Sequence, residues 1–140
     1  PSNGKNFVAR RIEEAISANE KKVFSNHHQI GVPTFARDFV SRLYEMLIAN
    51  EVGTFNVVNE GRASRFEYVS KIIELAGIDV EVVPASPDSF NRKANVANNE
   101  SAIAIKATQF GYKKLPEWSD SLKTYIDVDL KKWIKGLDGS

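Results

Sequence analysis

The hydrophobic and polar positions of this chain follow a helical period in some segments and a strand-like pattern in others. Apolar residues recur at helical spacing over residues 6–19, 35–50, 64–77 and 118–134, and a shorter helix fits residues 103–111. Runs of β-branched and aromatic residues at 22–24, 54–58 and 80–84 predict short strands. The alternation of the two patterns predicts a small mixed α/β domain of about four to five helices and three to four short strands.

The helix predicted at 35–50 has the clearest division into two faces. Arg37, Asp38 and Glu45 lie on its polar face. Such a division is typical of an amphipathic helix. Its apolar face carries Phe35, Phe39, Val40, Leu43, Tyr44, Leu47 and Ile48.

Local signals predict where the helices begin and end. Ser64 and Glu67 have the spacing of a capping box, and Gly77 is placed to end the helix that follows them. Before the helix at 35–50, Gly31 and Pro33 predict a rigid turn, and Thr34 is a candidate cap. In the last helix, Asp127 and Asp129 mark an expected break.

Composition narrows the function classes. The length of 140 residues fits one domain, 1–140, with 136–140 as an expected flexible tail. A net charge of +1 gives no reason to expect nucleic acid or an anionic membrane as a partner. The chain has no cysteine and no apolar run near the ~18 residues of a membrane span. Its start lacks the features of a signal peptide, so a cytoplasmic protein is expected.

Two pairs of polar residues could suggest a metal site or a catalytic acid pair, but their spacing argues against both. His27 and His28 are adjacent, so in an extended segment they point to opposite sides, and no third metal ligand is obvious. Asp127 and Asp129 stand two positions apart on a helix and do not meet. We therefore predict no metal site and no catalytic residue in this chain.

Several motifs resemble one family. The segment 29–34 reads Gln-x-Gly-x-Pro-Thr and precedes a helix and then the strand candidate at 53–58. Asn6-Phe7-Val8 opens the first helix, and Leu115-Pro116-x-Trp118 precedes the last one. This order resembles the C-terminal, substrate-binding half of dTDP-4-dehydrorhamnose reductases, which are nucleotide-sugar enzymes of the extended short-chain dehydrogenase/reductase superfamily.

Two hallmarks of that family are missing from the chain. No glycines are spaced as the G-x-G-x-x-G of a dinucleotide-binding turn, and no tyrosine is followed four positions later by lysine. The chain starts at Pro1, and Met46 is its only methionine. The resemblance therefore implies a fragment without the Rossmann half. It predicts that NAD(P)H serves the parent protein and that this chain alone binds no cofactor and is inactive.

The resemblance also implies a binding site for a nucleotide sugar, with a dTDP-sugar as the expected ligand. A turn that merely starts a helix is the alternative for 29–34, and capping is the alternative for Asn6. The family's Arg-Pro-x-x-Ser-x-Leu maps onto 97–103, where only the serine and a branched apolar residue remain, so a cation from the irregular segment 85–99 is expected to replace the arginine. The candidate binding residues are Asn6, Phe7, Gln29, Gly31, Pro33, Thr34, Arg92, Lys93 and Ser101.

Two functions follow as expectations. The first is the substrate-binding domain of an NAD(P)-dependent reductase of 4-keto sugars in polysaccharide precursor synthesis. The alternative is a non-catalytic regulatory module derived from the same superfamily. If the Rossmann half is missing, we also expect Phe7, Val8 and Phe35 to form an exposed apolar patch, with a homodimer or a loosened first helix as the consequence.

Overall fold

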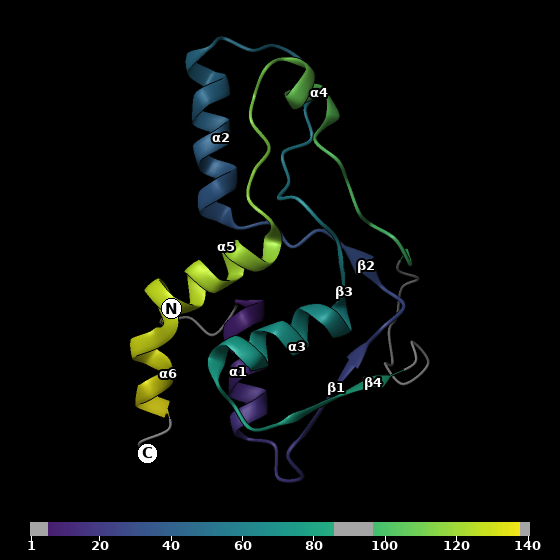
Figure 1. The fold of residues 1–140 in the computed structure, drawn as a ribbon, viewed down its shortest axis with the longest axis vertical. Helices are drawn as coiled ribbons and strands as arrows, with labels where there is room; N and C mark the ends of the chain where they lie inside the picture. Colours follow the sequence, from purple (N-terminus) through teal and green to yellow (C-terminus); the bar gives the residue numbers. More distant parts are fainter. Residues whose placement is uncertain (1–5, 86–96, 138–140) are drawn as a thin grey trace.

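The computed structural model describes residues 6–85 and 97–137 (Figure 1). Its first half contains α1 (Phe7–Ile16), β1 (Lys22–Asn26), β2 (Ile30–Gly31), α2 (Ala36–Ile48) and β3 (Ala63–Ser64). There follow α3 (Arg65–Ala76), β4 (Glu81–Ala85), α4 (Ile105–Gln109), α5 (Trp118–Tyr125), the π-helical turn η2 (Ile126–Leu130) and α6 (Lys131–Leu137). The predicted α/β class is confirmed.

Two short sheets join segments that are distant in sequence. β1 pairs with β4 in parallel, from Lys22 opposite Glu81 to Asn26 opposite Ala85. β2 pairs with β3 antiparallel, with Ile30 opposite Ser64. The strands predicted at 22–24 and 80–84 are confirmed, and the structure shows that they pair with each other.

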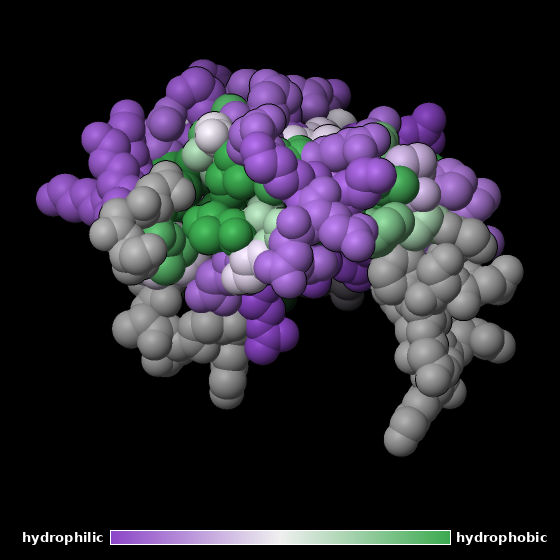
Figure 2. Space-filling model, turned by 90° about the horizontal axis from the view of Figure 1, so that it is seen from below, coloured by the Kyte–Doolittle hydropathy of each residue, from purple (hydrophilic) through white to green (hydrophobic). Residues whose placement is uncertain are grey.

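The core lies between α1, α3 and the C-terminal helices. Its larger cluster brings Ile12 of α1 and Ile72 of α3 against the helical segment of α5, η2 and α6, with Leu130 fully buried. A smaller cluster packs α1 and α3 onto β1 through Val23 and Val69. These apolar faces share the helical spacing that predicted the helices. Seen from the end of the molecule that holds α1 and α6, the surface is mainly hydrophilic around a limited hydrophobic area (Figure 2).

Most predicted helix signals are confirmed. Ser64 Oγ accepts from the Glu67 amide at 3.1 Å, and a Glu67 carboxylate oxygen accepts from the Ser64 amide at 2.6 Å, which completes the capping box. The bond from the Ser64 amide to the carboxylate is the main cause that holds the pKa of Glu67 below its ordinary value. Gly77 ends α3 with φ 71°, the left-handed geometry that favours glycine. The predicted break at Asp127 and Asp129 is the π-helical turn η2.

The predicted details of the turn before α2 are wrong. Gly31 belongs to β2 and is absent from the described glycines with positive φ, so the sheet pairing and not an unusual backbone angle places it here. Thr34 does not cap α2: the N-cap position is Phe35, which has no side-chain cap bond, and the Thr34 hydroxyl donates to the Val32 carbonyl at 3.3 Å. The Phe35 amide at the start of α2 instead donates to Asn59 Oδ1 at 2.9 Å.

The prediction of a strand at 54–58 is also wrong. Within the described part of the chain this segment pairs with no strand, and it runs as an irregular connection between α2 and β3. A strand needs a neighbour that shares its backbone hydrogen bonds, so β-propensity alone does not make one. The flexible tail expected at 136–140 stays a prediction. Gly136 and Leu137 lie in α6, and residues 138–140 fall outside the described residues.

Helix α2 has the predicted two faces, but the apolar face is the exposed one. Leu47 keeps 65% of its surface exposed and Arg42 only 7%. Figure 1 shows α2 standing away from the main body, with the 49–58 connection and α4 beside its far end. We call this exposed apolar surface the α2 patch. It comprises Phe39, Val40, Leu43, Tyr44, Leu47 and Ile48.

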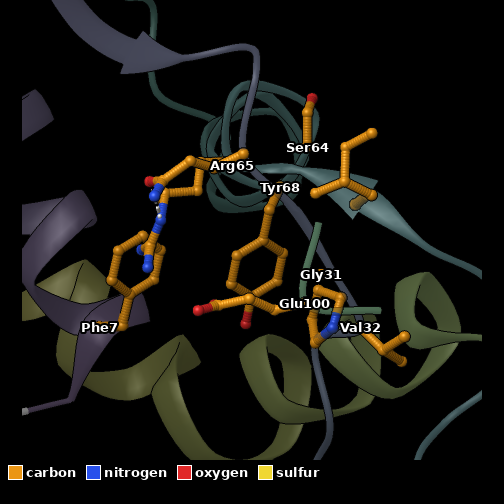
Figure 3. Close-up of a pocket in the computed structure, with 11 residues that line it drawn as sticks. Phe7, Gly31, Val32, Ser64, Arg65, Tyr68 and Glu100 are labelled. Atoms are coloured by element: carbon orange, nitrogen blue, oxygen red, sulfur yellow. Dashed lines mark hydrogen bonds between the residues drawn. The ribbon is translucent and has the colours of Figure 1, made fainter. Parts of the chain in front are cut away.

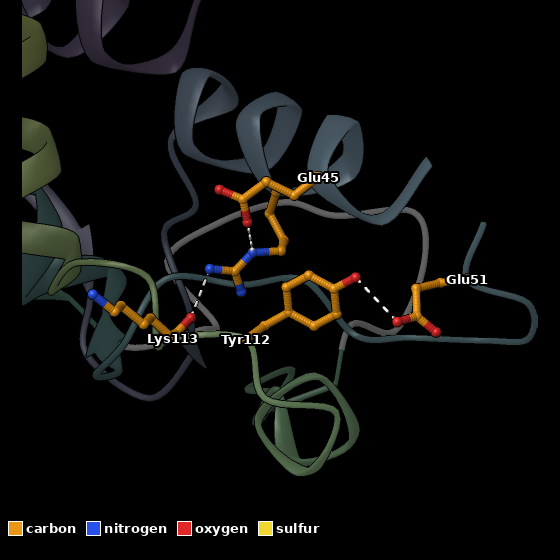
Figure 4. A network of polar contacts seen from close by, with 5 residues as sticks. Glu45, Glu51, Tyr112 and Lys113 are labelled. Atoms are coloured by element: carbon orange, nitrogen blue, oxygen red, sulfur yellow. Dashed lines mark hydrogen bonds and ion pairs between the residues drawn. The ribbon is translucent and has the colours of Figure 1, made fainter. Parts of the chain in front are cut away.

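A polar network fixes the buried side of α2 (Figure 4). Arg42 donates from Nε to Glu45 at 2.8 Å and from Nη2 to the Lys113 carbonyl at 2.6 Å. Its guanidinium lies 5.1 Å from the ring centre of Tyr112, whose hydroxyl donates to Glu51 at 3.1 Å. The packing of α2 therefore depends on polar contacts on the side that the sequence pattern marks as its outer face.

The exposed patch expected at the N-terminus is not found there. Val8 is 5% exposed, and Phe7 and Phe35 are half-buried, because α1 packs on α3 and on the C-terminal helices. Among the described residues, the α2 patch is instead an apolar surface that stays exposed. None of the described helices is both long and apolar enough to cross a membrane.

Candidate functional site

A cavity of about 380 Å³ opens where α1, β2, α3 and the segment 98–100 meet (Figure 3). Its wall is largely made by the segment 29–33, joined by the first residue of α1, the start of α3 and one acidic residue. These lining residues are Phe7, Gln29, Ile30, Gly31, Val32, Pro33, Ala63, Ser64, Arg65, Tyr68 and Glu100.

Backbone pairing on both sides of β2 holds this wall. β3 pairs along one edge of β2. Along the other edge, the Ile30 amide donates to the Asn98 carbonyl and the Glu100 amide donates to the Ile30 carbonyl, each at 2.8 Å. Residues from three distant parts of the chain therefore meet at Ile30, and this pairing brings Glu100 to the cavity.

Gln29 and Arg65 link β2 to the start of α3. Gln29 is 8% exposed, and its carbonyl accepts from the Arg65 amide at 2.9 Å. Its side-chain Oε1 also accepts from Arg65 Nε at 3.1 Å. The Arg65 guanidinium lies 5.6 Å from the centre of the Phe7 ring, within range of a cation–π contact. The glutamine of the motif thus positions an arginine at the cavity.

Aromatic side chains form the floor of the site. Phe7 and Tyr68 stack with ring centres 5.6 Å apart and planes at 7°. Tyr68 also meets Trp118 edge to face at 5.7 Å. Burial raises the pKa of Tyr68 from its ordinary value to about 12.

A second hollow of about 200 Å³ adjoins the first and shares Pro33 and Tyr68 with it. Asn6, Thr34 and the first residues of α2 line it together with Trp118, Leu122 and Tyr125. The two hollows together follow the whole length of the Gln-x-Gly-x-Pro-Thr segment.

The structure brings most of the candidate binding residues together. Phe7, Gln29, Gly31 and Pro33 line the first cavity, and Asn6 and Thr34 line the second hollow with Pro33. Asn6 also caps α1, because its Oδ1 accepts from the amides of Val8 at 2.9 Å and Ala9 at 3.3 Å.

Of the remaining candidates, one lies away from the cavity and two are not among the described residues. Ser101 is turned to its own loop, where its amide and hydroxyl donate to Asn99 Oδ1 at 2.9 and 2.6 Å, and it lines neither hollow. Arg92 and Lys93 lie outside the described residues. Their roles stay predictions.

Arg65, Tyr68 and Glu100 are among the cavity residues that sequence reasoning did not propose for binding. Arg65 and Tyr68 stand three positions apart at the start of α3, so they share a helix face, and this spacing was available from the sequence. Glu100 gave no such signal, because it reaches the cavity only through the pairing of its segment with β2. Among the described residues, no group of three or more histidine, cysteine, aspartate or glutamate side chains is arranged to hold a metal ion.

The small α/β fold, with a cavity walled by the segment 29–33, is that of a ligand-binding domain, and comparison with known proteins assigns its family. The chain belongs to the family described as the RmlD substrate binding domain, whose model matches residues 1–130.

Individual relatives agree with this assignment. A dTDP-4-dehydrorhamnose reductase from Clostridium acetobutylicum superposes with a TM-score of 0.85 at 28% identity over 90% of this chain and 44% of its own. The Bacillus anthracis enzyme, solved in complex with NADP, gives 0.83 at 26% identity over 89% of this chain and 43% of its own. The spore coat polysaccharide biosynthesis protein SpsK of Bacillus subtilis is 24% identical over 123 residues, which are 88% of this chain and 42% of that protein. The chain thus spans less than half the length of these relatives.

Proposed function

We propose that this chain is the sugar-nucleotide-binding domain of an NAD(P)-dependent reductase that acts on a dTDP-linked 4-keto sugar in the synthesis of a polysaccharide precursor. The observation that carries the proposal is the site itself. The motif at 29–34, which led from the sequence to this family, lines both hollows of the structure. The cytoplasmic location expected from the sequence stays a prediction.

The residues of this chain would bind and orient the substrate. Phe7 and Tyr68 offer an aromatic surface, Gln29 and Arg65 a polar edge, and Glu100 an acceptor for hydroxyl groups. NAD(P)H would supply the hydride, and this chain lacks both the glycine-rich turn and the Tyr-x-x-x-Lys pair of the family. We therefore propose that the domain alone carries out no reduction.

We further propose that a cofactor-binding half docks on the α2 patch. The patch is apolar and exposed on a helix whose other side is anchored by Arg42. Beside it runs the β-rich segment 54–58, which pairs with no strand among the described residues. Exposed apolar surface of this extent ordinarily marks an interface. The relatives are more than twice as long as this chain, which supports a further domain as the partner.

The regulatory alternative rests on one observation. The segment 97–103 lacks the arginine and proline that the resemblance leads us to expect near the substrate. A regulator derived from a reductase would keep the fold and lose such contacts.

Titrations of the 140-residue chain test the proposal. We expect dTDP-glucose to shift the NMR amide signals of residues 29–32 and Thr34, because that segment lines the two hollows. We expect NADPH and NADH, followed by their fluorescence, to show no saturable binding. Saturable NADPH binding in the micromolar range would contradict the assignment of the cofactor to another half. Unchanged amide signals with dTDP-glucose would contradict the proposed binding role and favour the regulator.

A further inference from the structure

Arg65 is the cationic side chain among the described residues that line the cavity. Its guanidinium is held on two sides, by Gln29 Oε1 at 3.1 Å from Nε and by the face of Phe7 at 5.6 Å. Because Gln29 is itself buried and Phe7 is stacked on Tyr68, both supports are fixed by packing. Arg65 is therefore positioned in advance, and a ligand would not have to order it.

The terminal nitrogens of Arg65 are left for a ligand. Its side-chain hydrogen bond to the described residues uses Nε, and neither Nη group donates to any of them. A guanidinium presents its donors as a planar fork that matches the oxygens of a phosphate or carboxylate. The edge of Arg65 that remains open is thus the part that binds anions best.

Glu100 lines the same cavity and restricts which anions fit. Figure 3 shows its carboxylate turned into the space beside Phe7 and Tyr68. No ion pair joins Glu100 to Arg65 within the described ranges, so the two charges do not cancel in direct contact. A bare inorganic anion would be repelled by Glu100, whereas a ligand with both a phosphoryl group and hydroxyl groups would satisfy Arg65 and Glu100 together.

We infer that Arg65 binds a phosphoryl oxygen of a nucleoside diphosphate sugar and is a specificity-determining residue of this site. The inference rests on the proposed function and adds the group that recognises the charged part of the ligand. It assigns to the start of α3 the cation that the sequence led us to seek at Arg92 or Lys93. Arg65 of α3 would then take the role of the arginine that the resemblance leads us to expect in the segment 97–103.

The test is an NMR titration of the 140-residue chain with dTDP-glucose, dTDP and thymidine. In the unaltered chain, the Arg65 Nε–H signal should shift with dTDP-glucose and dTDP and stay in place with thymidine. In Arg65→Gln, the affinity for dTDP should fall about tenfold or more, the usual loss for a hydrogen bond to a charged group, while that for thymidine should not change. Arg65→Lys keeps the charge without the fork and should lie between the two.

Arg62→Gln is the matched control. It removes the same charge three residues away, and Arg62 does not line this cavity. We expect its affinity for dTDP to stay within about twofold, since screening weakens the effect of an exposed charge that makes no contact.

The outcomes separate the inference from the proposed function. Equal dTDP affinity in Arg65→Gln and the unaltered chain, with amide shifts still at residues 29–32 and Thr34, would overturn the role of Arg65 and leave the binding function standing. No shift with any phosphorylated ligand would overturn both. If Arg65→Gln fails to fold, the Arg65 Nε–H signal of the unaltered chain and the Arg65→Lys variant decide the question.

Discussion

At the scale of single residues, the short polar side chains at helix starts behave as their spacing in the sequence indicates. Asn6 caps α1, and Ser64 and Glu67 form the reciprocal bonds of a capping box. These contacts span at most three positions in the chain, so they form without help from distant segments. Thr34 is the exception, because α2 has Phe35 as its N-cap and no side chain caps it there.

The capping box gives the first prediction. Ser64→Ala should lower the free energy of unfolding by about 1 kcal/mol, because it leaves the Glu67 amide without its acceptor. Urea denaturation followed by circular dichroism measures the change. Ser101→Ala is a suitable control, since Ser101 is exposed and bonds only within its own loop. An unchanged midpoint for Ser64→Ala would show that the cap does not stabilise α3.

At the scale of elements, Asn59 connects α2, the segment before α5 and α5 itself. It is 1% exposed. Its Oδ1 accepts from the Phe35 amide, and its Nδ2 lies 2.8 Å from Asp38 Oδ2, 3.0 Å from the Pro116 carbonyl and 3.0 Å from Ser121 Oγ. The Asn59 side chain therefore links α2, the segment before α5 and α5 itself. The sequence gives no sign that these three parts of the chain lie together.

The second prediction concerns this network. Asn59→Ala should cost about 1–3 kcal/mol of folding free energy or more, because it leaves buried polar partners unsatisfied. Hydrogen exchange should also show loss of protection in the first turn of α2. Asn56→Ala is the matched control, since the Asn56 side chain is exposed and makes one long bond of 3.4 Å to Ile103. Equal stability of the two variants would contradict the role of Asn59.

At the scale of the whole molecule, the main feature is an amphipathic helix whose apolar side is uncovered. The hydrophobic pattern of α2 correctly predicted which residues share a face. It could not indicate what that face contacts. The spacing of apolar residues shows which side chains share a helix face, but not which segment packs against them. The structure shows that Arg42 and Met46, and not the apolar stripe, are the buried residues of α2.

This feature gives the third prediction. If the α2 patch is an uncovered docking surface, the isolated chain should self-associate at high concentration, and Val40→Glu with Leu47→Glu should make it monomeric with little change in melting temperature. Sedimentation velocity over a concentration series measures the first effect and thermal denaturation the second. Ile72→Ala, in the buried core, is the contrasting variant and should lower stability by about 2–5 kcal/mol.

Either of two results would contradict the interpretation of the patch. A monomer at every concentration in the unaltered chain would remove the reason to expect a partner there. A large loss of stability in the double variant would mean that the patch belongs to the core. The homodimer expected from the sequence stays a prediction until this measurement.

The sequence alone determined the α/β class, the places where the major helices begin and the family motif at 29–34, because these depend on periodicity and on contacts between near neighbours. It failed for the strand at 54–58, for the cap of α2 and for the exposed surface, which depend on what lies opposite a segment in space. The cavity shows the same division. The sequence supplied Phe7, Gln29, Gly31 and Pro33, but only the pairing of β2 with residues 98–100 and with β3 brought Glu100 and Arg65 to them. Hydrogen bonds between distant backbone segments produce no periodic pattern of residue types in the sequence. Which charged side chains face the cavity is therefore decided by the tertiary structure.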